Sequence, residues 1–291
     1  MSSIATLNLV YDILRLDEKL ILQELRRRSA DFRLINLDKA AFNISDLSRD
    51  SLEGELFLIR SISHTRSVLI ARILEELGAL TINSSSAIDL GNNKLLSLLR
   101  LARVGLPVPE TLFAFSSEVA LRAAESVGLG KVPLVIKPVS GSWGRLVSLV
   151  CSVEELNLLL KHRSKMESPL MKIYMLQEYI EKPQRDIRII VVDGEAVAGI
   201  YRYAPSGEWR TNTARGGQAR PLEIDEELSE LSVKACEAIG ARYAGVDLIE
   251  SKSGYRVLEV NVVPEFKNVA RVTGVNIAAR IVEMLLNERK R

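Results

Sequence analysis

The C-terminal part of the chain carries two acidic side chains and an amide that could hold a divalent cation. Residues 243–251 and 255–261 alternate apolar and polar side chains around a Lys-Ser-Gly turn, which predicts a β-hairpin. If the turn is centred on its serine, Asp247 lies opposite Glu259, and Asn261 shares the face of Glu259. Facing carboxylates repel unless something neutralises them, and oxygen ligands at this spacing suit Mg²⁺ that carries nucleotide phosphates. The alternative is an acidic, solvated sheet face, and the same register points the opposite face into the core: Val246, Leu248, Leu258 and Val260.

A lysine followed by a glycine-containing loop could bind phosphate. Lys137 ends a short apolar run, and the loop Ser140-Gly141-Ser142-Trp143-Gly144-Arg145 follows it. A cation at the end of a buried strand can hold phosphate oxygens while loop N–H groups close over them. The loop is not a Walker A motif, because it lacks the GK[ST] order and leads into a strand. The alternative is an ordinary hairpin turn.

Further residues complete a set suited to phosphoryl transfer, which needs positioning and charge neutralisation more than a protein nucleophile. Lys94, near the start of a predicted helix, is another candidate cation. The segment Gln177-Glu178-Tyr179-Ile180 could offer backbone amides to an adenine and a carboxylate to a ribose. Additional polar residues lie on and after another predicted hairpin: Asp186, Arg188, Arg210 and Asn212. Each could singly be a solvated side chain, and their joint order along the chain is the stronger signal.

Alternating strands and helices position these residues. The first 86 residues repeat a β-α-β pattern, which predicts a parallel sheet with strands at Leu7–Val10, Phe32–Leu37, Glu55–Arg60 and Thr81–Ile82. A helix is expected over Ala87–Val104. Strands flank the glycine loop, hairpins are expected over residues 186–203 and 243–261 with a polar loop at 205–220, and Asp225 is expected to cap a helix. The predicted fold class is α/β, with mixed α+β parts.

Composition excludes several classes of protein. Of the 291 residues 47% are hydrophobic and 26% charged, which is the balance of a globular chain. The 39 basic and 37 acidic residues give no support to a nucleic-acid partner. Since no stretch resembles a secretory signal or a membrane span, we expect a cytoplasmic protein without a membrane partner. Cys151 and Cys236 lie far apart and are expected to be buried, inert thiols.

The order of these motifs resembles the ATP-grasp superfamily over essentially the whole chain. The Gly-Ser-Trp-Gly-Arg loop and Asp186-Ile187-Arg188 are similar to the RimK-type glutamate ligases. The stretch Asn261-Val262-Val263-Pro264-Glu265-Phe266-Lys267 and Trp209-Arg210-Thr211-Asn212 resemble the ligases that act with the amino-group carrier protein LysW. The resemblance implies an ATP-grasp fold with a pre-ATP-grasp domain at 1–86, a central subdomain at 87–180 and a C-terminal subdomain with the metal site at 181–291.

The resemblance also implies ATP and Mg²⁺, with two ions expected, and assigns roles to the residues above. Lys94 and Lys137 would bind phosphates, under a loop formed by Ser140, Gly141, Ser142, Trp143 and Gly144. Nucleotide contacts would come from Gln177, Glu178, Tyr179, Ile180, Asp186 and Arg210. Asp247, Glu259 and Asn261 would hold the metal, and Arg188, Asn212 and Lys137 would lie by the reacting groups.

As an activity, the resemblance implies that ATP phosphorylates the C-terminal glutamate of an acidic LysW-type carrier, and that the amino group of glutamate attacks the acyl phosphate in arginine biosynthesis. The segment Asn268-Val269-Ala270-Arg271 favours glutamate, because aminoadipate-type members resemble Gly-Phe there, and an Arg271 guanidinium could pair with a side-chain carboxylate at a reach that suits the shorter glutamate. An exposed arginine at a helix start is the alternative. Arg60, His64 and Arg66 follow a strand of the first domain, where a carboxylate substrate could dock.

Other functions stay open. An α-aminoadipate–LysW ligase of lysine biosynthesis, an enzyme that accepts both amino acids, and a RimK-type ligase that adds glutamate to a protein or peptide would share most of these motifs. A non-catalytic ATP-binding module is a further alternative, although such a module has no physical need to keep mutually repelling acids. Similarity to RimK-like ligases implies a homo-oligomer, either a dimer or a tetramer.

Overall fold

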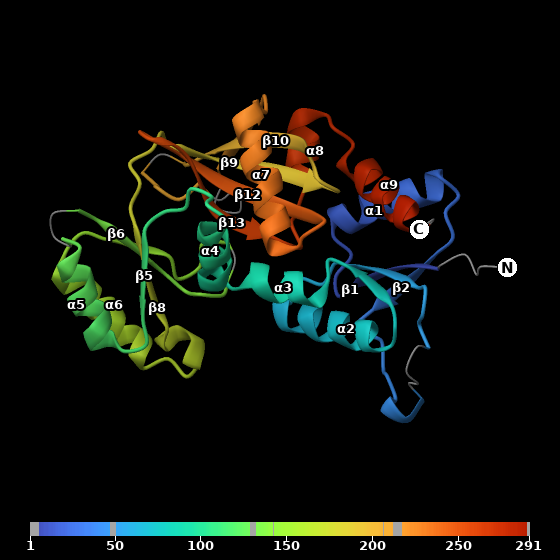
Figure 1. The fold of residues 1–291 in the computed structure, drawn as a ribbon, viewed down its shortest axis with the longest axis horizontal. Helices are drawn as coiled ribbons and strands as arrows, with labels where there is room; N and C mark the ends of the chain where they lie inside the picture. The colour runs from blue at the N-terminus through green and yellow to red at the C-terminus, as the bar shows by residue number, and fades with distance from the viewer. Residues whose placement is uncertain are drawn as a thin grey trace.

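The computed structural model describes residues 6–46, 51–128, 132–141, 143–205, 207–211 and 217–289. Within these ranges the strands form three sheets. In Figure 1 the N-terminal sheet lies at the right, the C-terminal sheet lies above the centre, and the central sheet lies at the lower left. The helices α3 and α4 run between them, so segments far apart in the sequence can share the space where the sheets approach one another.

The N-terminal sheet is parallel, as the β-α-β pattern predicts. Its strand order is β2-β1-β3-β4, and its strands are β1 (Leu7–Tyr11), β2 (Phe32–Asn36), β3 (Leu56–Ile59) and β4 (Leu80–Ile82). The connecting helices are α1 (Leu16–Arg27) and α2 (His64–Glu76), with a 3-10 turn η1 at Ile44–Asp46. The C-terminal helix α9 (Ile277–Glu288) returns to pack against α1 (Figure 1).

The expected helix over Ala87–Val104 is in fact two helices, α3 (Ser85–Asn92) and α4 (Lys94–Arg103). Asn93 is extended, with φ −103° and ψ 101°, and its side chain accepts the backbone N–H of Leu96. An asparagine that caps a new helix competes with continuation of the old one. The break places Lys94 at the first position of α4, from which its side chain reaches Gly141 and Glu259.

The central sheet is antiparallel, in the order β5-β8-β6-β7. Its elements are β5 (Thr111–Ala114), α5 (Ser117–Ser126), β6 (Leu134–Lys137), β7 (Ser148–Val150), α6 (Val153–Ser164), η2 (Pro169–Lys172) and β8 (Tyr174–Glu178). The strands on either side of the glycine loop were predicted, whereas β5 and α5 were not. Cys151 follows β7 and is exposed, so the prediction that both cysteines are buried is wrong for this one; Cys236 is buried.

The C-terminal sheet is also antiparallel, in the order β11-β10-β9-β12-β13. Its strands are β9 (Arg185–Val192), β10 (Glu195–Tyr203), β11 (Gln218–Leu222), β12 (Tyr243–Ser251) and β13 (Gly254–Asn261), with helices α7 (Glu226–Ile239) and α8 (Lys267–Thr273). Both predicted hairpins are present, and Asp225 caps α7 as expected. The polar loop predicted at 205–220 ends in the unpredicted strand β11.

The hairpin of β12 and β13 reaches its predicted pairing by a different route. Its turn has two residues, since Ser251 pairs with Gly254, and this register alone would place Asp247 opposite Leu258. A β-bulge at Leu258 adds one residue and restores the pairing of Asp247 with Glu259. The expectation that Leu258 points into the core is therefore wrong, because the bulge turns Leu258 to a cavity while Val257 is buried.

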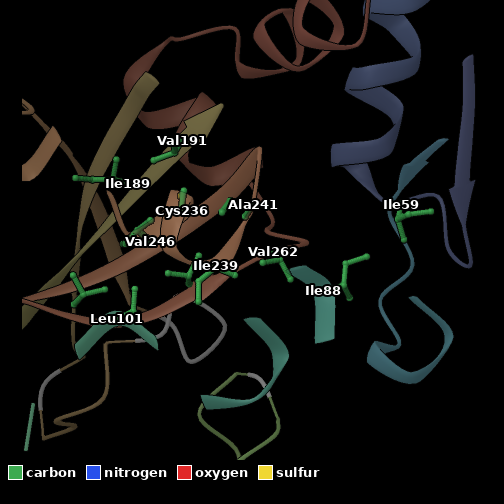
Figure 2. Packing of buried hydrophobic residues seen from close by; sticks show 14 of the residues in the cluster. Ile59, Ile88, Leu101, Ile189, Val191, Cys236, Ile239, Ala241, Val246 and Val262 are labelled. Carbon is green, nitrogen blue, oxygen red and sulfur yellow. The ribbon is translucent and has the colours of Figure 1, made fainter. Parts of the chain in front are cut away.

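A continuous apolar core joins the N-terminal sheet to the C-terminal sheet. Figure 2 shows Ile59 and Ile88 on the side of the N-terminal sheet, followed by Val262 and then Val246 and Ile239 of the C-terminal part. Ten side chains of the central sheet and its helices form a separate buried cluster. No helix in the described ranges combines the length and apolar character that a membrane crossing requires.

We expect Gly91→Ala to lower the free energy of unfolding by about 1–3 kcal/mol, as overpacking does in tight interiors. A Cβ at Gly91 would lie 2.5 Å from Cγ1 of Val262. Val262 follows the predicted metal ligand Asn261 in the sequence. Urea denaturation would measure the loss. The double variant Gly91→Ala/Val262→Ala should cost less than the sum of the single changes, and strictly additive costs would contradict the contact.

Candidate active site

A cavity between the central and C-terminal sheets collects most residues predicted to bind nucleotide. Its empty space is about 980 Å³, a volume that includes solvent at its open mouth. Predicted residues from separate segments line it: Lys94, Lys137, Gly141, Trp143, Gly144, Gln177, Glu178, Tyr179, Ile180, Asp186, Arg210, Asp247 and Glu259. The segments whose order suggested a shared site therefore meet in one place, which we call the nucleotide cavity. Ser142 and Asn212 lie outside the described residues, and Ser140 is in the loop but does not line the cavity.

A row of charges crosses the C-terminal sheet. Register places Arg188 beside Asp247, and Asp247 beside Glu259. Arg188 binds Asp247 through two nitrogens, with Nη2 2.6 Å from Oδ2, and Nζ of Lys94 lies 2.9 Å from Oε2 of Glu259. Burial by itself raises the pKa of Glu259, but Lys94, Arg188 and Lys137 together hold that pKa well below its usual range. The carboxylate of Glu259 is therefore anionic at neutral pH, and cations balance both facing acids.

Asn261 completes an oxygen-bearing set with the two acids. Its Nδ2 donates to Oε1 of Glu259 at 3.1 Å, so the amide lies beside that carboxylate. Two carboxylates and an amide oxygen are hard donors that fit Mg²⁺, with phosphate and water as its further ligands. In the part of the chain that the structure describes, no group of three or more His, Cys, Asp or Glu side chains is placed to hold a metal ion. The fit thus depends on ligands that the nucleotide would bring.

Arg202 is a site residue that the sequence analysis missed. Its guanidinium lies 2.8 Å from Oδ2 of Asp186 and 3.1 Å from Oδ2 of Asp247, and its side chain is only 6% exposed. Burial opposes its charge, but Asp186 and Asp247 raise the pKa of Arg202 above its ordinary value. The hydroxyl of Thr211 also donates to Asp186. Asp186 therefore lines the cavity with its carboxylate already engaged by protein groups.

The two predicted phosphate-binding lysines reach the same part of the cavity. Lys137 ends β6, and burial lowers its pKa to about 8 although nearby Glu259 opposes the shift. Nζ of Lys94 donates to the carbonyl of Gly141 at 2.9 Å, which ties α4 to the glycine loop. Since both lysines interact with Glu259, positive charge gathers where phosphate oxygens would meet a metal-bearing carboxylate.

The end of β8 forms the opposite wall. Glu178 pairs with Arg256 of β13 at 2.8 Å, which links the central sheet to the hairpin that carries the acids. The ring of Tyr179 meets Trp209 edge to face, with centroids 6.1 Å apart. Trp209 and Trp143 are the two tryptophans of the chain, and both line this cavity. Their fluorescence can therefore report on nucleotide binding.

A second cavity lies between the N-terminal and C-terminal sheets, with about 1640 Å³ of empty space counted to its mouth. It shares five lining residues with the nucleotide cavity: Lys94, Gly141, Trp143, Arg202 and Glu259. Arg188, Asn261, His64 and Asn268, all singled out from the sequence, line its remainder. Burial and the charge of Lys94 lower the pKa of His64. The two cavities thus meet at the lysine and carboxylate expected to handle phosphate and metal.

Three residues predicted to bind substrate line neither cavity. Arg60 is fully buried, and its guanidinium binds Glu18 and the carbonyl of Pro264. Arg66 is exposed and pairs with Asp38, and Arg271 is exposed on α8. The expectation that Arg60 meets a substrate at the sheet edge is corrected here, because the buried Glu18 carboxylate draws it inward. Arg66 and Arg271 have no support from this geometry as substrate ligands.

A glycine loop, two lysines and paired acids held between two antiparallel sheets, behind a parallel N-terminal sheet, define an ATP-grasp enzyme. The chain belongs to the RimK-like ATP-grasp family, because the profile of the RimK-like ATP-grasp domain matches residues 91–285. The profile of the LysX preATP-grasp domain matches residues 7–90. It is therefore an ATP-dependent carboxylate–amine ligase.

Named relatives cover nearly the whole chain. It is 39% identical over 282 residues to the alpha-aminoadipate–LysW ligase LysX of Sulfurisphaera tokodaii, covering 96% of this chain and 97% of the relative. It is 38% identical over 282 residues to the glutamate–LysW ligase ArgX of Sulfolobus acidocaldarius, with the same coverage. The crystal structure of a RimK domain protein ATP-grasp from Sphaerobacter thermophilus matches with a TM-score of 0.73 at 21% identity, covering 97% of this chain and all of that one.

We expect Arg202→Met to lower the free energy of unfolding by about 3–5 kcal/mol, because it leaves Asp186 and Asp247 buried without their shared cation. Arg122→Met, which breaks the exposed pair with Glu118, should cost about 1 kcal/mol or less. Chemical denaturation of both variants tests the difference. Equal losses of unfolding free energy would show that Arg202 stabilises the buried carboxylates no more than an exposed ion pair does.

We also expect nucleotide binding to weaken between pH 7 and pH 9. With its pKa lowered to about 8, ligand-free Lys137 falls from about 90% to about 10% protonated over this range. Phosphate binding needs the charged form, so the dissociation constant of a non-hydrolysable ATP analogue with Mg²⁺ should rise. Tryptophan fluorescence titrations measure it, and Lys137→Met should flatten the profile. An unchanged pH slope in the variant would assign the effect elsewhere.

Proposed function

We propose that the protein joins the amino group of glutamate to the C-terminal glutamate carboxylate of an acidic, LysW-type amino-group carrier protein. ATP would activate the carrier carboxylate as an acyl phosphate, with ADP as the product. The reaction would serve arginine biosynthesis, and lysine biosynthesis too if α-aminoadipate is also accepted. The near full-length similarity to two LysW ligases supports this choice over other RimK-like activities.

The observation that carries the proposal is the junction of the two cavities at Lys94 and Glu259. A ligase of this kind must bring a nucleotide, a carboxylate and an amine to one point. The nucleotide cavity fits the first, and the second cavity opens to the same phosphate-handling residues from the side of the N-terminal sheet. A module that only bound ATP would have no need of the second space.

Within this arrangement each side chain has a task. Lys94 and Lys137 would bind the phosphates, and Asp247, Glu259 and Asn261 would hold Mg²⁺, which neutralises phosphate charge when bound. Arg188, which lines the second cavity beside Asp247, would bind the transferred phosphoryl or the acyl oxygen. The carrier glutamate would enter through the second cavity, followed by the amino acid.

α-Aminoadipate is the second candidate substrate, because the LysX and ArgX relatives are almost equally identical to this chain. The exposed position of Arg271 removes the geometric reason that favoured the shorter glutamate. The choice between the two amino acids therefore depends on a direct comparison.

Purified protein with Mg²⁺, ATP and a LysW-type carrier should release ADP when glutamate is added, and the carrier mass should increase by one glutamyl residue. Glu259→Gln should lower kcat/KM by roughly 100-fold or more, because it weakens the hold on the Mg²⁺ that would neutralise the phosphoryl charge in the transition state. Parallel reactions with α-aminoadipate compare the substrates. Turnover with α-aminoadipate but not glutamate would overturn the glutamate assignment, and no carrier-dependent ADP release would overturn the carrier ligase itself.

A further inference from the structure

The second cavity contains two cations gathered around one carboxylate. Oε1 of Glu265 lies 3.2 Å from Nη1 of Arg15, and its Oε2 lies 3.5 Å from Nζ of Lys267. All three residues line the second cavity, and none of them lines the nucleotide cavity. The Glu265 side chain is 36% exposed, so these are loose contacts that another carboxylate could replace.

Arg15 is fixed from behind by a buried acid. Its Nε and Nη2 donate to Glu18 at 3.0 and 2.8 Å, and Glu18 also accepts from Arg60 at 2.8 Å. Burial by itself raises the pKa of Glu18, but Arg60 and Arg15 hold it below its usual range. A guanidinium held by two bonds to one carboxylate keeps its orientation, which leaves Nη1 turned towards Glu265 and the cavity.

The start of helix α1 also places Lys267. Oδ1 of Asp17 accepts the backbone N–H groups of Phe266 and Lys267, the latter at 2.8 Å. Nη1 of Arg60 donates to the carbonyl of Pro264 at 2.9 Å. The first turn of α1 thus binds the segment that follows β13, the strand that carries Glu259 and Asn261. The fold therefore fixes the guanidinium of Arg15 and the backbone of Lys267 on the same side of the cavity, and the Lys267 ammonium, 32% exposed, reaches Glu265 from there.

We propose that Arg15 and Lys267 bind the side-chain carboxylate of the incoming amino acid, and that Glu265 forms ion pairs with both cations when no amino acid is present. The inference rests on the proposed function and names the residues that select its substrate. It makes the second cavity selective for amino acids with an acidic side chain.

The position of the two cations decides which carboxylate they bind. The attacking amine must reach the acyl phosphate near Lys94, Glu259 and Arg188. The α-carboxylate is bonded to the same carbon as the amine, so it must stay close to that point. The side-chain carboxylate is separated from the amine by a chain of methylene groups, and it alone can reach the part of the cavity that the nucleotide does not share.

The test uses Arg15→Met and Lys267→Met in the full chain, with Arg33→Met as the matched control. Arg33 is exposed on β2 of the N-terminal sheet, pairs with Glu55 at 3.5 Å and lines neither cavity. Kinetics with Mg²⁺, ATP and carrier compare glutamate with glutamine, which lacks the side-chain charge, and with isoglutamine, which lacks the α-carboxylate charge. Arg15→Lys, which keeps the charge, should recover part of the activity lost in Arg15→Met.

Each cation variant should lower kcat/KM for glutamate by roughly 10- to 100-fold, the size expected for a lost hydrogen bond to a charged group, and change kcat/KM for glutamine little. The KM for ATP should keep its wild-type value in both cation variants. The control variant Arg33→Met should keep all wild-type kinetic constants. Glu265→Gln should lower the KM for glutamate, because the resident carboxylate is gone. An unchanged preference for glutamate over glutamine in both cation variants would overturn the proposal, as would a lost preference over isoglutamine alone.

Calorimetric binding of glutamate, with Mg²⁺ and a non-hydrolysable ATP analogue present, separates this inference from the proposed function. Suppose that the wild-type protein binds glutamate but does not modify the carrier, and that Arg15→Met loses this binding. The amino-acid site would then be supported and the carrier ligase refuted. Suppose instead that the wild-type protein modifies the carrier, and that Arg15→Met and Lys267→Met bind glutamate as well as the wild type does. The carrier ligase would then be supported and the amino-acid site refuted.

Discussion

Repulsion between the carboxylates of Asp247 and Glu259 is the constraint on which the site depends. Two unit charges 4 Å apart interact with about 4 kcal/mol at an effective dielectric of about 20. The protein balances them with cations from separate elements: Lys94 at the start of α4, Arg188 on β9 and Arg202 on β10. Neutralising the acids thus brings helix α4 and four strands of the C-terminal sheet, β9, β10, β12 and β13, to one place. The same cations are the kind that phosphate oxygens need.

Two β-bulges explain what hairpin alternation could and could not predict. Asp247 does lie opposite Glu259, but only because the bulge at Leu258 corrects the register set by a two-residue turn. The hairpin of β9 and β10 has a register shift between Ala196 and Ala198, which pairs Asp186 with Arg202, whereas simple counting from the turn gives Tyr201. Counting from the turn would therefore not have found Arg202. Bulges beside active sites re-aim side chains, and the alternation of polar and apolar residues does not mark where they occur.

Local signals in the sequence were otherwise reliable where a single short segment determines the outcome. Helix caps such as Asp225, the parallel strands of the first sheet and the loop after Lys137 follow from residue types and spacing. The contacts that join the domains do not. Asn83 binds the backbone of Tyr243 and Val262, and Asp17 binds that of Lys267, across sequence separations that no periodicity reveals. The buried position of Arg60 belongs to this second class, which is why its inward turn was not predicted.

The central claim is that the β12–β13 hairpin and Asn261 hold the divalent ion that carries the nucleotide. A crystal structure with Mn²⁺ in place of Mg²⁺ and a non-hydrolysable ATP analogue tests it most directly, because the anomalous signal locates the ion independently of the protein atoms. The account predicts an anomalous peak about 2.1 Å from oxygens of Asp247, Glu259 and Asn261 and from the phosphates, near the octahedral distances of Mg²⁺. A nucleotide bound in the cavity with the metal peak away from all three side chains would contradict it.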